Sequence, residues 1–489
     1  MLRGYHLKEE LEKLWVSRIQ DTTLIPRSLL RGGSLKTRQM FKNLFHAIRN
    51  RTGIDESNLK KYLANTSWFT LERAVRVFLG FAIGIYVARF LGPEKFGLLS
   101  YAISFTALFS SFATLGLDGI LVKALVHEPY KKDILLGTVF RLKFLGALAA
   151  VLLIIFSLLL MPQESSASLL INITAFIFLF QSFNVIDLFF QSRILSKYVV
   201  FAQLIQVGVS ASIKLFLVSL KAPLLWFACA VVMDSIVLAV GLSIVYLRHD
   251  FLKLVFSFDW KIARQLLASS FPLMLSEIAI AIYMRVDQII IKTIFDNKTV
   301  GCYAVVVVIC EAFYFIPLVI IRTFFPVILN NKKESAKLYY NNLQKLYDLM
   351  VIISFSIAFL ITIAAEKIIL LLFGLEFSAA IPVLKIYVWA SVFVFLGAAN
   401  ERWLWIENLQ KYAFYRTLGG CLLSVGLNLL LVPKLNIQGA AISALISFGF
   451  VTYISFVLFK PMRSHLKIVS RSFNIFAGLK RIFYQESLQ

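Results

Sequence analysis

Twelve apolar runs, each long enough to cross a membrane as a helix, occupy most of the sequence between residues 67 and 459. A transmembrane helix needs about 20 predominantly apolar residues. Because 59% of the 489 residues are hydrophobic, the composition excludes a disordered, fibrous or disulfide-stapled chain. We therefore predict an all-α integral membrane protein with about 12 transmembrane helices. The runs lie near residues 67–91, 97–118, 138–161, 169–190, 199–220, 223–247, 268–294, 301–325, 346–365, 382–405, 412–432 and 437–459.

The basic residues are distributed unevenly between the two sides that these runs define. The chain holds 50 Lys and Arg residues against 27 Asp and Glu residues, a net charge of +23. If the N-terminus is cytoplasmic, 38 of the 50 basic residues fall on the cytoplasmic side, 8 fall outside and 4 lie within spans. Cytoplasmic loops of membrane proteins carry such an excess. The charge therefore indicates membrane topology rather than nucleic-acid binding, and we expect both termini in the cytoplasm. Residues 1–65 contain no apolar core of a cleavable signal peptide.

Two pairs of short segments indicate an internal duplication. The segment Ser196-Lys-Tyr-Val-Val-Phe-Ala-Gln-Leu is similar to Gln410-Lys-Tyr-Ala-Phe-Tyr-Arg-Thr-Leu, at an offset of 214 residues. Earlier in each half, Phe96-Gly-Leu-Leu-Ser-Tyr-Ala is similar to Val300-Gly-Cys-Tyr-Ala, at an offset of 204 residues. Because each half holds six predicted helices, an even number, we predict a parallel repeat whose pseudo-two-fold axis lies along the membrane normal. Chance similarity between apolar helices is the alternative.

These patterns predict two six-helix lobes with a basic extension at each end of the chain. Apolar residues near helical spacing at 7–19 and 35–48 are typical of basic amphipathic helices on an anionic inner leaflet. Alternatively, Met40 is the true start of the chain. The predicted parts are a cytoplasmic basic amphipathic extension (1–65), an N-lobe (66–247), a cytoplasmic linker (248–267), a C-lobe (268–460) and a basic cytoplasmic tail (461–489).

Several motifs between residues 64 and 460 resemble those of a known family. They are Asn65-Thr-Ser-Trp, Val87-Ala-Arg-Phe-Leu-Gly-Pro-Glu-Lys-Phe-Gly-Leu-Leu-Ser-Tyr-Ala, Leu115-Gly-Leu-Asp, Leu372-Phe-Gly-Leu-Glu-Phe and Pro382-Val-Leu-Lys-Ile. These motifs look like those of bacterial polysaccharide flippases of the Wzx type, which belong to the multidrug/oligosaccharidyl-lipid/polysaccharide exporter superfamily. Elementary helix physics also explains part of the longest motif. Gly92-Pro93 is expected to end the first helix, and Gly97 to let the second pack closely.

The resemblance implies a transporter, not an enzyme, in the bacterial inner membrane. Its substrate would be an undecaprenyl-pyrophosphate-linked oligosaccharide of the O-antigen or capsule type, moved from the cytoplasmic to the periplasmic leaflet by alternating access. The implied partners are membrane lipids, the polysaccharide polymerase and the chain-length regulator. No cofactor is expected beyond H⁺ or Na⁺ as a coupling ion.

Four basic residues lie within predicted spans, and they are the predicted substrate-binding residues: Arg73, Arg76, Lys214 and Arg285. A charge at the centre of a bilayer costs at least about 2.5 to 3.5 kcal/mol, so it normally faces a cavity or a partner. Arginine can bind a phosphate through two hydrogen bonds. Because helices one and seven are repeat equivalents, we expect Arg76 and Arg285 to face each other across a cavity. The alternatives are that Arg73 reaches the membrane interface, and that Arg285 pairs with nearby carboxylates.

Carboxylates within the spans are the predicted ion-coupling residues: Asp234, Glu277, Asp287 and Glu311. A buried carboxylate can load and release a proton or hold Na⁺ during a transport cycle. Each of them can instead simply neutralise a neighbouring Arg or Lys.

Two other functions remain as alternatives. A multidrug antiporter of the same superfamily would favour an acidic cavity for cationic drugs, which the four cations within spans argue against. A membrane-embedded glycan polymerase or ligase usually carries a sizeable periplasmic catalytic loop, whereas the longest outside connection here, about residues 366–381, is short and mostly apolar. The sequence has no phosphate-binding P-loop, and its five His residues do not have metal-ligand spacing.

Overall fold

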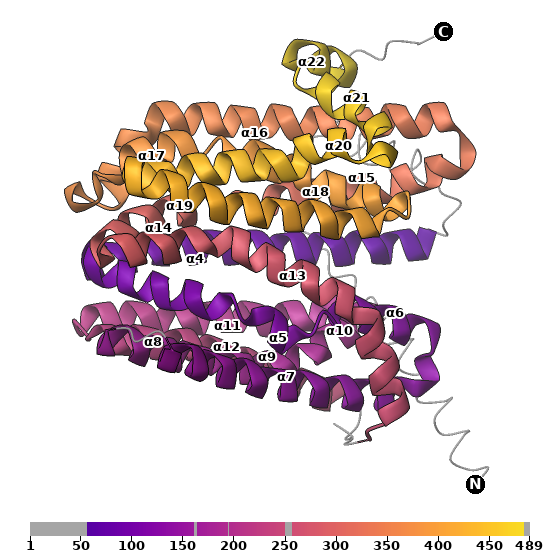
Figure 1. The fold of residues 1–489 in the computed structure, drawn as a ribbon. Coiled ribbons are helices and arrows are strands. Elements are labelled where there is room, and N and C mark those ends of the chain that lie inside the picture. Colours follow the sequence, from indigo (N-terminus) through magenta and orange to yellow (C-terminus); the bar gives the residue numbers. More distant parts are fainter. Residues whose placement is uncertain (1–55, 161–163, 194, 250–256, 484–489) are drawn as a thin grey trace, which may run out of the picture. The chain divides into compact units, whose positions relative to one another are not determined.

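The computed structural model describes residues 56–160, 164–193, 195–249 and 257–483. The chain divides into two compact units, Met1–Tyr62 and Leu63–Gln489, and the second carries the fold described here. The amphipathic helices predicted at 7–19 and 35–48 lie outside the described residues, as do residues 250–256 of the predicted 248–267 linker. Within the described residues the secondary structure is entirely helical (Figure 1).

The described residues contain ten helical stretches that are long and apolar enough to cross a membrane. Two of these stretches each hold two predicted spans, so the ten accommodate the twelve spans predicted from the sequence. Helix α4 (Glu56–Ala107) is interrupted at Gly92, where φ is 67°, directly before Pro93. Helix α19 (Gln410–Gly449) is interrupted at Asn436, where φ is 54°. The predicted break at Gly92-Pro93 is confirmed, because glycine alone adopts this backbone conformation without strain and proline cannot continue a helix.

The N-lobe contains the remaining elements up to His249. They are α5 (Ser110–Thr114), α6 (Asp118–His127), η1 (Pro129–Lys131), α7 (Lys132–Leu160), α8 (Ser165–Ala175), α9 (Ile177–Gln181), η2 (Ser182–Asn184), α10 (Val185–Ser192), α11 (Ser196–Ser219) and α12 (Leu224–His249). The short elements α8, α9, η2 and α10 together form the fourth span.

The second half of the chain begins with α13 (Trp260–Ile294). It continues with α14 (Asn297–Glu311), α15 (Phe315–Glu334), α16 (Ala336–Leu372), η3 (Leu375–Phe377), α17 (Ala380–Tyr387) and α18 (Ala390–Ile406), and after α19 with η4 (Phe450–Ile454), α20 (Ser455–Leu458), η5 (Lys460–Met462), α21 (Arg463–Ser472) and α22 (Ile475–Phe483). Helices α15 and α16 run about ten residues beyond their predicted spans, because a helix can continue as a polar helix after its apolar stretch has ended.

The spans alternate between two ends of the bundle. We call the end that carries Gly92, Phe295 and Gly374 the outer end, and the end that carries Trp260, Ser335 and Asn408 the inner end. In Figure 1 the outer end is at the left and the inner end at the right. The positive-inside prediction assigns the inner end to the cytoplasm.

Helix α13 connects the two halves of the bundle (Figure 1). Near the inner end, Ala263 and Leu266 belong to the apolar core of the N-lobe. Gly116 approaches the backbone of this part of α13 at Met274. Further along, Ile290 and Ile291 belong to the larger apolar core, to which helices of both lobes contribute. One continuous helix thus packs against both lobes.

The two repeats contact each other at the outer end through equivalent glycines. A Cβ atom on Gly97 would lie 1.8 Å from the carbonyl oxygen of Asn297, and one on Gly301 would lie 1.9 Å from that of Pro93. Both pairs of partners are related by the offset of 204 residues found in the sequence. Because the contact is reciprocal, this crossing lies on a pseudo-two-fold axis between the repeats. The structure therefore supports the predicted parallel duplication and the close packing at Gly97.

Candidate functional site

Three of the four predicted substrate-binding cations form ion pairs. Arg76 Nε lies 2.6 Å from Glu72 Oε1, one turn earlier in α4. Lys214 Nζ lies 2.6 Å from Asp234 Oδ2, which joins α11 to α12, and donates to Ser210 Oγ at 2.9 Å. The third cation, Arg285, pairs with Glu311 of α14. Since an ion pair within a span offsets much of the cost of each charge, these contacts account for the cations without a substrate.

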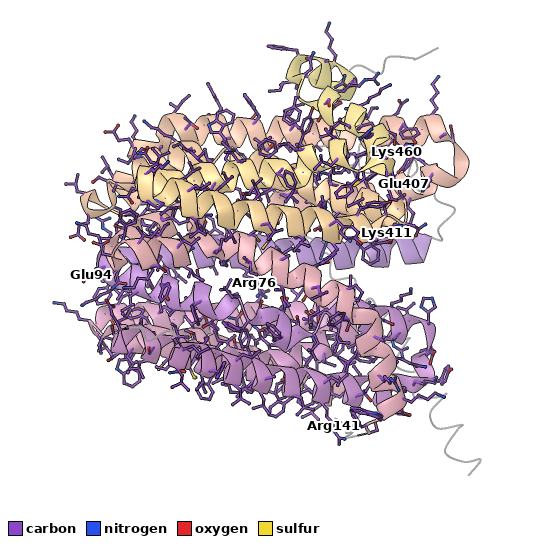
Figure 2. The ribbon with its side chains drawn as sticks, in the orientation of Figure 1. Arg76, Glu94, Arg141, Glu407, Lys411 and Lys460 are labelled. Carbon is purple, nitrogen blue, oxygen red and sulfur yellow. The ribbon has the colours of Figure 1, made fainter. Side chains whose placement is uncertain are left out.

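Arg76 and Arg285 belong to separate groups of charges, one in each lobe. Arg285 Nη2 lies 3.1 Å from Glu311 Oε1 and also interacts electrostatically with Asp287. Arg76 interacts with Asp187 in the N-lobe. Figure 2 shows Arg76 between the two groups of helices, between the ends marked by Glu94 and Lys411.

Two predicted ion-coupling carboxylates, Asp287 and Glu277, accept hydrogen bonds from neighbouring helices. Asp287 is 4% exposed and accepts from the hydroxyl of Tyr303 in α14 and from the backbone amide of Gln288 at 2.9 Å. Glu277 accepts from Thr114 Oγ1 at 2.8 Å, which ties α13 to α5. The other two, Asp234 and Glu311, are the ion-pair partners of Lys214 and Arg285.

Six charged residues of the N-lobe and α13 form one electrostatic network. Glu72 and Lys143 are each only 2% exposed, and Lys143 pairs with Asp118. Asp187 interacts with all three of these residues and with Arg76, and Glu277 interacts with Asp118 and Lys143. The four carboxylates and two cations have a formal charge of −2. We call this set the N-lobe charge network: Glu72, Arg76, Asp118, Lys143, Asp187 and Glu277.

Three arginines from both lobes form a second feature, which we call the arginine cluster. Arg322 in α15 interacts electrostatically with Arg402 in α18 and with Arg73 in α4. It also interacts with Glu72 and Asp187 of the N-lobe charge network. All three side chains are exposed at the protein surface. Arg402 also stands over the ring of Phe325, 5.9 Å from its centroid. Among the described residues, neither Arg73 nor Arg402 has an ion-pair partner. The fourth predicted cation, Arg73, therefore lies near another base, Arg322.

Arg322 and Arg402 were not predicted as site residues from the sequence, because both were assigned to cytoplasmic connections. In the structure Arg322 lies in the middle of α15 and Arg402 lies in the last turns of α18. Both fall inside the last turn of a predicted apolar run, at residues 301–325 and 382–405. Their position could have identified them as candidates, because a basic residue in the last turn of an apolar run can belong to the span and not to the loop that follows.

Polar contacts join the lobes at the outer end. Glu164, from the connection between α7 and α8, pairs with Lys292 of α13 at 3.3 Å and accepts from the side chain of Asn297 at 3.5 Å. Arg89 donates to the backbone carbonyl of Leu371 at 3.4 Å. Together with the glycine crossing, these contacts close the bundle at its outer end. The arginine cluster lies toward the opposite, inner end.

Comparisons with known proteins identify both a family and a fold. Residues 62–332 match the family model described as polysaccharide biosynthesis protein, which covers more than half of the chain. The sequence matches none of the curated proteins with which it was compared.

Several solved structures share the fold at low sequence identity. An inward-facing multidrug resistance MATE family transporter of the MOP superfamily has a TM-score of 0.62 and 14% identity, covering 82% of this chain and 99% of that chain. An outward-facing MATE family transporter has a TM-score of 0.58 and 16% identity, covering 84% and 96%. The lipid II flippase MurJ, in an inward closed conformation, has a TM-score of 0.57 and 16% identity, covering 84% and 95%. The chain therefore has the fold of a MOP-superfamily transporter, as the sequence resemblance predicted.

Proposed function

Because the chain belongs to the polysaccharide biosynthesis protein family, we propose that it is a flippase for a lipid-linked oligosaccharide. The substrate is an undecaprenyl-pyrophosphate-linked repeat unit, moved from the cytoplasmic to the periplasmic leaflet of a bacterial inner membrane. The fold, shared with a lipid II flippase and with MATE transporters, supports a transporter rather than an enzyme. The observation that carries the proposal is the arginine cluster.

The arginine cluster has the chemistry to bind a pyrophosphate. Arg322 is repelled by Arg402 and by Arg73, and Glu72 and Asp187 offset part of that repulsion. An anion bound among the three guanidinium groups would offset more of it. Each guanidinium can donate two parallel hydrogen bonds to phosphate oxygens, which replace the water that the head group loses on leaving the membrane surface. Arg73 comes from the N-lobe, whereas Arg322 and Arg402 come from the C-lobe. A bound pyrophosphate would therefore bridge the two lobes.

The closed outer end supports an alternating-access cycle. With the lobes joined at Gly97 and Gly301 and by Glu164, the substrate enters from the inner end, where the arginine cluster lies. Binding between the lobes favours a conformation in which the inner end closes and the outer end opens. The polymerase and the chain-length regulator would receive the substrate on the other side.

The N-lobe charge network is the proposed site of ion coupling. Its formal charge of −2 favours the uptake of a positive ion. Two of its residues, Glu72 and Lys143, are buried away from water. Binding of H⁺ or Na⁺ there would neutralise charge close to Arg73, which neighbours Glu72 in sequence and belongs to the arginine cluster. Loading and release of the ion would thereby alter the affinity for the pyrophosphate. Of the four carboxylates predicted to couple ions, only Glu277 belongs to this network.

Substitution of the cluster arginines tests the proposed function. We expect Arg322→Ala and Arg402→Ala each to abolish export of the surface glycan while the protein remains in the membrane. Lys411→Ala is the matched control, because Lys411 is an exposed base at the same inner end, as Figure 2 shows. Export at the level of the unmodified protein in both arginine variants would refute the assignment.

A multidrug antiporter remains the second candidate, because the net negative charge of the N-lobe charge network would also suit a cationic drug. Purified protein separates the two functions. We expect undecaprenyl pyrophosphate to bind and a cationic dye not to displace it. Dye binding that is lost in Asp187→Asn but kept in Arg322→Ala would instead support the antiporter.

A further inference from the structure

The C-terminal helices α21 and α22 are fixed to the transmembrane bundle by buried polar contacts. Asp348 of α16 is completely buried and accepts two hydrogen bonds from Arg481, at 2.7 and 2.9 Å. Gln344, one turn earlier, donates to Asp348 at 2.9 Å and to the backbone carbonyl of Ile468 at 3.1 Å. A paired charge and a satisfied amide in a buried site hold the two helices in a defined position.

A histidine fixes the first of the two helices. His465 Nε2 lies 2.8 Å from the hydroxyl oxygen of Tyr347, and its ring stacks on Trp403 with centroids 3.9 Å apart. On the same face of α21, Ile468 and Val469 are buried. This buried face of α21 is thus part of the C-lobe core. Residues 463–483 of the predicted basic tail are a docked pair of helices.

The outward faces of α21 and α22 are basic and aromatic. Arg463, Lys467 and Arg471 are exposed, and their spacing of four residues places them in one row along α21. On α22, Phe476 is 83% exposed beside the exposed Lys480. Residues 460–483 contain no acidic residue. An apolar patch beside a row of cations is typical of a surface that binds the interface of an anionic membrane.

The helix pair lies where such an interface is expected. Asp348 is twelve residues from the start of α16 at Ala336, which places it about 18 Å along that helix at 1.5 Å per residue. In Figure 1, α22 lies outside the bundle, beside the inner half of α16. Since α16 is long and apolar enough to span a membrane, we expect a surface beside it near the inner end to meet lipid head groups.

We propose that α21 and α22 form a binding surface for anionic phospholipid. The row Arg463, Lys467 and Arg471, with Lys480, binds the phosphate groups, and Phe476 enters the apolar layer beneath them. Because Arg481 and His465 fix the helices to α16 and α18, bound lipid anchors the C-lobe to one leaflet. Lipid binding at this surface does not depend on which substrate the protein transports.

The test uses the full-length protein in nanodiscs of phosphatidylcholine alone, or of an equal mixture with phosphatidylglycerol. Hydrogen–deuterium exchange is measured over residues 463–483. We expect slower exchange in the anionic nanodiscs, and loss of that protection at high salt. Each surface base changes the affinity for anionic lipid by about 5-fold, so the variant R463Q/K467Q/R471Q/K480Q should show no difference between the two lipids.

The control variant K221Q/K298Q/K385Q/K434Q removes the same charge from exposed bases predicted to lie on the other side of the membrane. It should keep the full difference between the lipids. Equal exchange of the unmodified protein in both nanodiscs would overturn the proposal, as would protection by phosphatidylglycerol that persists in the first variant. The latter result would mean that phosphatidylglycerol acts through residues other than these four bases.

Arg481→Gln distinguishes docking from lipid binding. It should accelerate exchange over α22 in both lipids, because the completely buried Asp348 loses its cation. Lys480→Gln, at the neighbouring exposed position, should leave exchange in phosphatidylcholine unchanged. If Lys480→Gln released the helix as Arg481→Gln does, the division between a docked inner face and a lipid-binding outer face would be wrong.

Discussion

Replacement of either glycine at the outer crossing by alanine should shift the protein away from the closed outer end. The added Cβ would lie 1.8 Å from Asn297 O for Gly97→Ala and 1.9 Å from Pro93 O for Gly301→Ala, where ordinary contact begins at 3.4 Å. Each added Cβ would therefore lie about 1.5 Å too close to the opposing carbonyl oxygen. Both obstructing atoms belong to the backbone, so no change of rotamer relieves the clash, and the helices must move apart.

The size of the effect follows from the cost of overpacking. Forcing an extra methyl group into a packed contact costs about 1 to 3 kcal/mol. If the two lobes can separate at the outer end, that cost shifts the equilibrium toward the open form by about 5-fold to 150-fold. Because the contact is reciprocal about the pseudo-two-fold axis, we expect similar shifts for the two variants.

Distances between spin labels measure this shift. Labels at Lys95→Cys and Leu375→Cys, which are exposed outer-end positions in different lobes, report the separation in nanodiscs. Cys229 is replaced by Ser, since the other three cysteines are buried. Gly84→Ala is the matched control, because it lies in α4 and a Cβ there meets no atom within 4 Å. A distance distribution in both crossing variants that equals that of the control would refute the reasoning.

Two further predictions concern other charged side chains. Lys214→Met should destabilise the protein by up to about 3 to 5 kcal/mol, because Asp234 is left without its cation, and the double variant with Asp234→Leu should recover most of the loss in thermal unfolding. If the recovered double variant has lost glycan export, the Lys214–Asp234 pair takes part in transport; normal export would leave the pair a structural role. Burial lowers the pKa of His465 from its ordinary 6.5 to about 3. As the pH falls, His465 is therefore protonated in the undocked state before it is protonated in the docked state. Docking of α21 should therefore weaken as the pH falls below 6.5, by up to about 1.4 kcal/mol per pH unit, and proteolysis of the tail should become less pH-dependent in His465→Phe.

The membrane-spanning architecture was predictable because its determinants are local. An apolar run of sufficient length becomes a span wherever it stands in the chain, and Gly92 before Pro93 ends a helix whatever surrounds it. The duplication was also visible, since the residues around Gly97 and Gly301 repeat at a constant offset. The helices that extend beyond the membrane were underestimated, because apolarity marks the bilayer and not the end of a helix.

The pairing of charges was decided only by the tertiary structure. Sequence proximity suggested Asp287 or Glu277 as partners of Arg285, whereas the ion pair forms with Glu311 on the next helix. Arg481 pairs with Asp348, 133 residues away. The sequence indicates how deep in the membrane a charge lies, because depth follows from counting residues along a helix. It does not indicate which way the charge faces around the helix axis or which helix stands opposite, because those depend on how the helices pack.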